Sequence, residues 1–424
     1  MKLKIVYFLI IAAICLIGCS SCGIREIDDN TRAGVGRSDI IETDAVKTGG
    51  NDDSPVQTGG KTLPFEAETV PPVPELKEKR LKFIAAGDNI IHESVYTDAK
   101  KRSSDGNSFN FRPMYDGIAD YVAAADIAFI NQETPTAGEN YGYHGYPNFN
   151  SPQEAGHTLV EIGFDIVNIA TNHMLDMKTN GLHDFINFWK SLDNVLMIGG
   201  YDNYADYDNV RIYETNGIKI AFLSYTYDTN GMTLDPSSTL IVPLFDEAVI
   251  RRQVQLARDA ADLVFVSAHW GIENDFAPSD TQKKYAKVFA DAGVDAVIGH
   301  HPHVVQPVEW MEGSGGNRML LIYSLGNLIS TMNYGNNMVG GIAEFDIVIA
   351  PGTKPYIDAP VYIPVVTHYS LERDGLQVYF LEDYTAELAA KHGCTLYTSN
   401  FSLAYIENII KSEIASEFLP AYMK

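Results

Sequence analysis

Cysteine is scarce in this chain, and its distribution excludes a disulfide framework. Of the 424 residues only four are cysteines, and Cys15, Cys19 and Cys22 lie near the N-terminus, which leaves Cys394 alone in the body of the chain. Disulfide scaffolds and cysteine-based zinc sites both need several cysteines within the folded region. Any metal in the folded region must therefore be bound through oxygen and nitrogen atoms.

Basic residues are also few, which excludes nucleic acid as a partner. The chain has 31 Lys and Arg against 55 Asp and Glu, for a formal net charge of -24. Nucleic-acid binding requires a basic surface, and the field of this chain would repel any long polyanion unless bound cations or local basic residues offset it. The charge also favours solubility outside the cell.

No hydrophobic run is long enough for a comfortable membrane span. The apolar run at 5–17 follows a short basic start and falls short of the roughly 20 residues that a spanning helix needs. We therefore predict a secretory signal at 1–18. The stretch Leu16-Ile17-Gly18-Cys19 resembles a bacterial lipobox, which implies cleavage before Cys19 and lipidation of its thiol. An uncleaved anchor is the alternative, and both place the protein at the extracellular face of the cell membrane.

Residues 19–77 are rich in Asp, Thr, Gly and Pro, with the proline run Val70-Pro71-Pro72-Val73-Pro74 near the end. Such a segment cannot bury enough apolar surface to offset the entropy of ordering, so we predict a disordered tether.

From residue 82 onward, short apolar runs alternate with helical patterns, which is typical of an α/β fold. A hairpin is expected at Asn216-Gly217. The expected strands are 82–88, 127–130, 165–170, 195–200, 263–268, 294–298 and 319–324, and the expected helices are 115–125, 152–162, 181–191, 246–262, 281–292 and a C-terminal one near 402–418.

Five of these strands end in polar side chains that bind metals or transfer protons. In open α/β sheets the ligand crevice lies beyond the carboxyl ends of the strands, so we expect these side chains to converge. They are Asp88, the pair Asn131 and Glu133, the pair Asn172 and His173, His269, and the cluster His300, His301 and His303.

This mixture of carboxylate, amide and imidazole groups fits a catalytic divalent metal such as Mn, Fe or Zn. Two ions would need a bridging carboxylate, which Asp88 or Glu133 would supply, and such a pair lowers the pKa of a bound water. His173, beside the amide ligand Asn172, would then be free to protonate a leaving group.

The motifs around these residues resemble those of the CapA-type poly-γ-glutamate capsule proteins, over about 81–330. That family is similar to the calcineurin-like metallophosphoesterases, so the resemblance implies a four-layer α/β/β/α sandwich with a dinuclear centre. We expect this domain at 78–385, and the sequence pattern predicts a helical tail at 386–424. The motifs are Asp88, Asn131-Gln132-Glu133-Thr134-Pro135, Asn172-His173-Met174-Leu175-Asp176, His269-Trp270-Gly271-Ile272-Glu273, Gly299-His300-His301-Pro302-His303 and Tyr323-Ser324-Leu325-Gly326-Asn327.

The resemblance implies a catalytic acid, His173, and a set of metal ligands. The spacing permits either His300 or His301 as a further ligand, because one gives His-x-x-His and the other His-x-His with His303. The implied ligands are Asp88, Glu133, Asn172, His269, His303 and one of these two histidines.

The chain also departs from the family pattern. Metallophosphoesterases usually place a ligand histidine two residues after the first aspartate, whereas the next imidazole here is His92. Trp270 also fits a packing role, and Asn327 also fits a turn. The further candidates for contact with the ligands or the substrate are His92, Asn131, Asp176, Trp270, Glu273 and Asn327.

Three functions remain open from the sequence. The first is a metal-dependent hydrolase or transferase acting on γ-glutamyl amide or phosphoester bonds. The second is a capsule assembly subunit that binds an anionic polymer such as poly-γ-glutamate, or its synthesis machinery, without turnover. The third is a lipoprotein receptor that holds no metal.

Overall fold

The structure is a computed structural model, and it describes residues 78–424. The predicted signal peptide at 1–18, the lipidation at Cys19 and the tether at 19–77 lie outside these residues and stay predictions. Within 78–424, no helix is both long and apolar enough to cross a membrane.

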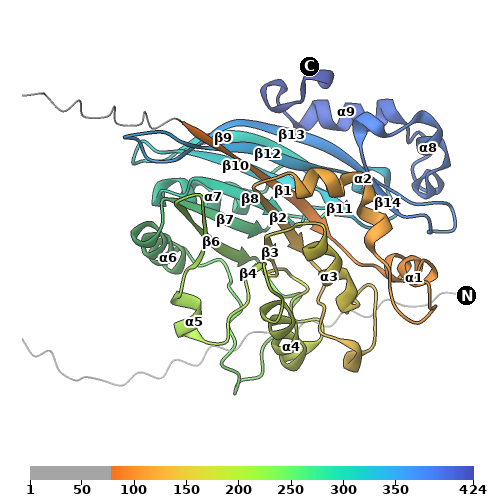
Figure 1. Ribbon diagram of the computed structural model, residues 1–424, viewed down its shortest axis with the longest axis horizontal. Coiled ribbons are helices and arrows are strands. Elements are labelled where there is room, and N and C mark those ends of the chain that lie inside the picture. Colours follow the sequence, from red (N-terminus) through yellow and green to blue (C-terminus); the bar gives the residue numbers. More distant parts are fainter. Residues whose placement is uncertain (1–77) are drawn as a thin grey trace, which may run out of the picture. The chain divides into compact units, whose positions relative to one another are not determined.

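Two β-sheets form the centre of the fold (Figure 1). The first has the strand order β14-β13-β12-β1-β2-β3-β4, with β11 paired to β1, and the second has the order β5-β6-β7-β8-β10-β9. The strands are β1 (Lys79–Asn89), β2 (Ile127–Gln132), β3 (Ile166–Asn168), β4 (Leu196–Ile198), β5 (Arg211–Thr215), β6 (Ile218–Thr226), β7 (Leu263–His269), β8 (Ala296–His300), β9 (Val305–Glu312), β10 (Arg318–Leu325), β11 (Asn327–Ile329), β12 (Val339–Ile349), β13 (Tyr356–His368) and β14 (Gln377–Phe380).

Helices cover the outer faces of both sheets, which completes the expected four-layer α/β/β/α sandwich. The helices α2, α3 and α4 pack on the first sheet, and α6 and α7 on the second. The helices are α1 (Glu93–Lys101), α2 (Arg112–Ala123), α3 (Gln153–Glu161), α4 (Lys178–Lys190), α5 (Tyr204–Asp208), α6 (Glu247–Ala260), α7 (Asp280–Ala292), α8 (Ala386–Lys391) and α9 (Leu403–Glu413).

The sequence explains why α6 and α7 form where they do. Ile250, Val254 and Ala257 recur at helical spacing on α6 and are buried against the second sheet. Helix α7 begins with a capping box between Ser279 and Gln282, which satisfies backbone donors of the first turn, and ends at Gly293, whose φ of 93° suits a left-handed cap.

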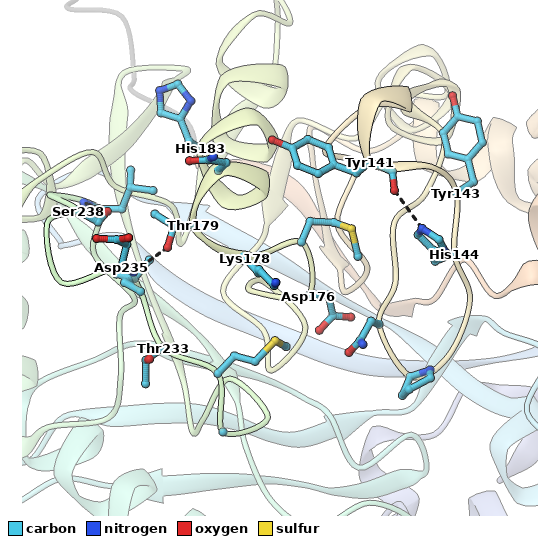
Figure 2. Close-up of a pocket in the computed structure, with 18 of the residues that line it drawn as sticks. Tyr141, Tyr143, His144, Asp176, Lys178, Thr179, His183, Thr233, Asp235 and Ser238 are labelled. Carbon is cyan, nitrogen blue, oxygen red and sulfur yellow. Dashed lines mark hydrogen bonds between the residues drawn. The ribbon is translucent and has the colours of Figure 1, made fainter.

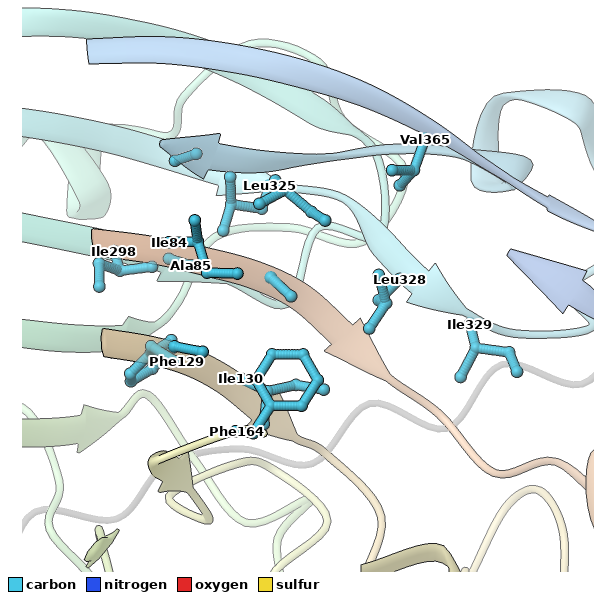
Figure 3. Packing of buried hydrophobic residues seen from close by; sticks show 14 of the residues in the cluster. Ile84, Ala85, Phe129, Ile130, Phe164, Ile298, Leu325, Leu328, Ile329 and Val365 are labelled. Carbon is cyan, nitrogen blue, oxygen red and sulfur yellow. The ribbon is translucent and has the colours of Figure 1, made fainter. Parts of the chain in front are cut away.

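The space between the sheets is filled by aromatic and branched side chains. The ring of Phe83 on β1 lies 5.2 Å from that of Phe265 on β7 and 4.7 Å from that of Phe345 on β12. Figure 3 shows further members of this buried cluster, among them Ile298 of β8 and Leu325 of β10. Each fully buried side chain of this size contributes about 1.5–3 kcal/mol, so the two sheets are held firmly against each other.

The parallel strands place their carboxyl ends at a common edge. Strands β1, β2, β3 and β4 are parallel neighbours in the first sheet, as are β6, β7, β8 and β10 in the second. Every polar strand end that the sequence singled out lies on one of these strands or on the loop that follows it.

Most expected elements are confirmed, including the β5–β6 hairpin, which turns at Asn216 and Gly217 with positive φ angles. Strand β9 was missed because it is an edge strand containing Pro307 and two glutamates, and edge strands carry little hydrophobic pattern. Helix α1 and strand β11 were also missed. Residues 386–424 contain only helical segments, and their Ile406 and Phe418 join the main core, while the domain boundary at 385 stays a prediction.

We predict that Gly87→Ala destabilises the fold by about 3 kcal/mol or more. A Cβ atom at Gly87 would lie 2.0 Å from the backbone oxygen of Gly326, and backbone cannot move aside cheaply. Denaturant unfolding measures the change. The matched control Gly315→Ala, whose Cβ has room, should change stability by less than about 0.5 kcal/mol, and equal effects of the two variants would contradict the argument.

Candidate metal centre

Asp88 lies where the two sheets meet, and it links them. It pairs with Asn131 of β2 and with Asn327 of β11 within the first sheet. Its Oδ1 accepts a hydrogen bond from Asn131 Nδ2 at 2.8 Å, and its Oδ2 accepts one from the backbone N–H of His301 at 3.2 Å. Oδ2 also lies 3.0 Å from His303 Nδ1. The loop after β8 is therefore held by a carboxylate of the opposite sheet.

The ionised form of Asp88 is stabilised despite its complete burial. Burial opposes the charge, but the adjacent imidazoles of His300 and His303 outweigh it and hold the pKa of Asp88 well below its usual range. Asn131 is held in turn, because its Oδ1 accepts from Asn168 Nδ2 at 2.7 Å, and Asn168 bonds to Ser224 of the second sheet. Asn131 thus orients Asp88 through its amide nitrogen, while its amide oxygen accepts the hydrogen bond from Asn168.

Glu133 carries the clearest sign of a missing partner. Its side chain is 1% exposed, and neither carboxylate oxygen has a hydrogen-bond partner among the described residues. Burial raises the pKa of Glu133 well above its usual range; nearby His303 opposes this rise, while Asp88 and Glu273 add to it. A buried carboxylate without hydrogen bonds is costly, and a bound cation is the usual compensation.

Three overlapping groups of side chains around Glu133 have ligand atoms within 4.8 Å of one another. Their oxygen and nitrogen donors are those that divalent transition metals take in catalytic sites. The donor set and the orphaned oxygens of Glu133 therefore fit a divalent metal. The groups are Asp88 with Glu133 and His303, Glu133 with His269 and His301, and Glu273 with His301 and His303.

The histidines differ in charge. Burial, together with the nearby His301, lowers the pKa of His269 well below its usual range, and burial with the charge of His303 lowers the pKa of His301 to about 3. Both are neutral imidazoles, the form that binds metals. Burial also acts to lower the pKa of His303, but Glu133 and Asp88 outweigh it and raise the pKa to about 9. His303 is therefore protonated at neutral pH in the metal-free protein, and its Nε2 lies 3.4 Å from Glu133 Oε1.

The backbone after β8 is strained where it presents these histidines. His301 has φ of 97° and His303 has φ of 57°, in the left-handed region that non-glycine residues rarely adopt. A Cβ atom at Gly299 would lie 2.0 Å from the backbone oxygen of Tyr323, so only glycine fits there. These constraints turn His301 and His303 toward the first sheet.

His300 and His301 are placed differently by this loop. His300 stacks on Phe129 with ring centroids 5.7 Å apart, and its Nδ1 lies 3.4 Å from Asp88 Oδ1 without hydrogen-bond geometry. His301 is a member of two of the three ligand groups, and His300 is a member of none. The geometry favours the His-x-His choice, while the ligand role of each histidine stays a prediction.

His173 and Asp176 form a separate pair beside the ligand groups. His173 Nδ1 lies 2.8 Å from Asp176 Oδ2, which also accepts a hydrogen bond from the backbone N–H of Phe149 at 2.6 Å. The ring of Phe149 packs edge-on against His173 at 4.8 Å. These contacts fix the imidazole through one nitrogen and leave Nε2 available for proton transfer.

Asn172 is held by residues on both sides. Its Oδ1 lies 2.9 Å from His269 Nε2, and its Nδ2 donates to Asn230 Oδ1 at 3.2 Å. Asn230 Nδ2 lies 3.4 Å from His173 Nδ1, so Asn230 contacts both members of the Asn172-His173 motif. The sequence analysis missed Asn230 because Asn230-Gly231 has the composition of an ordinary turn.

Of the other residues that the sequence singled out, Asn327 and His92 lie at the site and Trp270 does not. Asn327 Oδ1 lies 3.1 Å from His303 Nδ1 and orients it, and His92 accepts a hydrogen bond from the backbone N–H of Thr331. Burial and the charges of His303 and His173 lower the pKa of His92 to about 3. Trp270 does not join the site, because its side chain points to the outer face of the second sheet, and its Nε1 donates to the backbone oxygen of Tyr323.

A large groove adjoins the His173–Asp176 pair (Figure 2). Its volume is about 1770 Å³, and Asp176 is one of its lining residues. The tyrosine- and glycine-rich loop after β2 forms one side of it. Tyr227, which the sequence analysis also missed, lies at the ligand groups, with its ring 4.5 Å from that of His301.

We predict that metal binding releases protons and strengthens as pH rises toward 9. A cation must displace the proton of His303, because Glu133 and Asp88 raise the pKa of that imidazole to about 9 in the metal-free protein. Calorimetric titration of the metal-free protein with Mn²⁺ in two buffers of different ionisation enthalpy counts the protons released.

The variant Glu133→Gln should weaken metal binding by about 100-fold or more, since even residues that only support ligands contribute 10–100-fold. The exposed residue Glu407 provides the control Glu407→Gln, which should bind metal normally. Metal binding without proton release, or normal binding by Glu133→Gln, would contradict this assignment.

The chain resembles proteins of known family and fold. It is 28% identical over 293 residues to the capsule biosynthesis protein CapA of Bacillus anthracis, covering 66% of this chain and 67% of that protein. It is 26% identical over 315 residues to the PGA biosynthesis protein CapA of Bacillus subtilis strain 168, covering 74% and 79%.

Among solved structures, the calcineurin-like phosphoesterase YfkN of Bacillus subtilis gives a TM-score of 0.39 at 12% identity, covering 78% of this chain and 99% of that one. A putative 5'-nucleotidase from Staphylococcus aureus gives a TM-score of 0.42 at 11% identity, and the match covers 72% of this chain and only 55% of the nucleotidase. Likenesses this weak carry no argument about activity.

A family model described as bacterial capsule synthesis protein PGA_cap matches residues 82–332, which is more than half of the chain. This match spans the same motifs that the sequence analysis compared with the CapA-type proteins, and it includes all of the residues that converge around Glu133. The chain therefore belongs to the PGA_cap family of bacterial capsule synthesis proteins.

Proposed function

We propose that the protein is a metal-dependent hydrolase or transferase that acts on γ-glutamyl amide bonds during the synthesis, export or processing of poly-γ-glutamate. The observation that carries the proposal is the orphaned carboxylate of Glu133, surrounded by imidazole and carboxylate donors, beside the His173–Asp176 pair. Membership of the capsule synthesis family and the names of the two CapA relatives support the choice of polymer.

Two divalent ions, of Mn, Fe or Zn, are the proposed cofactors, held by Asp88, Glu133, Asn172, His269, His301 and His303. When bound, they would polarise the substrate carbonyl and lower the pKa of water. Three overlapping ligand groups that share Glu133, His301 and His303 support two adjacent ions rather than one.

His173 supplies the proton in the proposed reaction. As water adds to the carbonyl carbon and the C–N bond breaks, the departing amine takes the proton from His173 Nε2. Asp176 holds Nδ1 at 2.8 Å and stabilises the protonated ring, and the ring of Phe149 covers one edge of the imidazole. The residues of the chain therefore position the acid and keep its side chain largely buried.

The protein is proposed to work at the extracellular face of the cell membrane, anchored by a lipid on Cys19. The lipobox-like stretch before Cys19 and the following segment rich in Gly and Pro support this proposal. The synthesis machinery of the polymer is the proposed partner.

We predict that His173→Ala lowers kcat by about 100-fold or more without loss of metal, because general acid catalysis typically contributes 10²–10⁴-fold. The measurement combines metal analysis of the purified protein with cleavage assays on poly-γ-glutamate and on a generic phosphodiester. The exposed residue His157 provides the control His157→Ala.

Each result has a distinct meaning. Unchanged cleavage in His173→Ala would remove the acid role. Tight polymer binding by the wild-type protein without any turnover would favour the assembly subunit. Cleavage of the phosphodiester alone would make the protein a phosphoester hydrolase, and the absence of stoichiometric metal would exclude the metal centre.

We also predict that Cys19→Ala moves the protein from the membrane fraction to the medium or the soluble fraction. A single cysteine thiol carries the proposed lipid, so its removal should abolish labelling by a radioactive fatty acid. Cys22→Ala is the matched control and should retain the label. Persistent membrane attachment of Cys19→Ala would favour an uncleaved N-terminal anchor instead.

A further inference from the structure

The groove beside His173 is formed by three segments of the chain. One side is the loop that contains Tyr141, Tyr143 and His144, the opposite side is the loop at 231–240, and the start of α4 lies between them (Figure 2). The backbone N–H of Asp235 donates to Thr179 Oγ1 at 2.8 Å and joins one side to α4. The groove is thus built from segments that are bonded to one another.

The groove reaches Asp176, the residue that holds the proposed acid, while His173 itself is not among the lining residues. Asp176 holds His173 through Oδ2. The other oxygen, Oδ1, is buried without a hydrogen-bond partner among the described residues, in a residue that is 6% exposed. A buried acceptor of this kind calls for a donor such as an amide N–H.

Lys178 supplies the positive charge of the groove. It is the only lysine or arginine among the lining residues, it is exposed, and it makes no ion pair with any residue in 78–424. Figure 2 shows it between Asp176 and the side that carries Asp235. Its φ of 59° places it in the left-handed region, where the chain turns into α4.

The other side chains that line the groove are acidic, aromatic or polar. Glu93 and Asp235 carry negative charge, and His144 and His183 are exposed imidazoles. Four tyrosines and a series of threonine, serine and asparagine side chains make up much of the rest. In a chain of net charge -24, a polyanion needs a local cation, and Lys178 is the one that this groove offers.

The size of the groove indicates an extended ligand. Small-molecule sites usually enclose about 300–1,000 Å³, whereas this groove has about 1770 Å³. Tyrosine rings provide flat apolar surface for methylene groups, and hydroxyl and amide side chains provide hydrogen bonds to peptide groups. A polymer that alternates methylene, amide and carboxylate groups matches the tyrosine rings, the hydroxyl and amide side chains, and Lys178.

We infer that the groove binds the leaving-group segment of an anionic polyamide, with a substrate carboxylate on Lys178 and a substrate amide N–H on Asp176 Oδ1. This inference rests on the proposed function, because it places the polymer on the side of the site where His173 delivers its proton. Lys178 is a specificity-determining residue, and Asp176 both positions His173 and contacts the substrate.

The test is the binding of a defined oligo-γ-glutamate to the metal-loaded full chain carrying His173→Ala, so that the ligand is not consumed. Adding Lys178→Glu should weaken binding by at least about tenfold and reduce its dependence on salt, because charge reversal replaces an attraction with a repulsion. Lys178→Arg should restore most of the affinity. The same oligomer with amidated α-carboxylates should bind weakly to every variant.

The exposed lysine Lys283 on α7 provides the charge-matched control Lys283→Glu, which should bind the oligomer as the parent does. Equal binding by Lys178→Glu and Lys283→Glu, or tight binding of the amidated oligomer, would overturn the groove assignment and leave the proposed function intact. If the parent binds no oligomer and the wild-type protein cleaves none, both the groove assignment and the proposed function fall.

Discussion

The structure depends on one buried carboxylate, that of Asp88. It lies at the end of β1, accepts a hydrogen bond from Asn131 within its own sheet, and accepts another from the backbone of His301 in the loop of the opposite sheet. A buried charge of this kind is tolerated only when its partners are fixed, and its partners here are fixed by the packed sheets. The apolar core thus provides the rigidity, and Asp88 determines how the two strand edges face each other.

The polar residues around Asp88 differ in whether their hydrogen bonds are satisfied. Asn131, Asn168 and Ser224 form a buried chain of side-chain hydrogen bonds that runs from Asp88 to the second sheet. Glu133, by contrast, has no hydrogen-bond partner among residues 78–424, and the nearest cationic group is the ring of His303, whose Nε2 lies 3.4 Å from Oε1. Natural proteins rarely leave a buried carboxylate unpaired without a functional reason. The contrast between the satisfied chain and the unsatisfied glutamate separates the residues that support the site from those that would bind a ligand.

The sequence was informative where parallel strands end and less so where loops fold. Asp88, Glu133, His269 and His303 were all placed at one edge by the rule that carboxyl ends of parallel strands converge, and the structure brings them together. The choice between His300 and His301 depends on positive φ angles at His301 and His303, which no pattern of residue types predicts. Trp270 follows His269 directly, and the alternation of side chains along a strand carries it to the other face. Asn230 and the groove depend on how loops approach one another, which leaves no periodic signal in the sequence.

The loop that follows β6 takes part in both the metal centre and the groove. Asn230 bonds to Asn172 and lies beside His173, while residues 231–240 of the same loop line the groove. Any ligand that stabilises this loop in the groove also stabilises the orientation of Asn172, and a bound metal that fixes Asn172 also fixes the loop. By thermodynamic reciprocity, each ligand must then raise the affinity of the other by the same factor. Under the proposed function, this loop would therefore couple metal binding to polymer binding, and the metal-loaded form would hold the polymer more tightly.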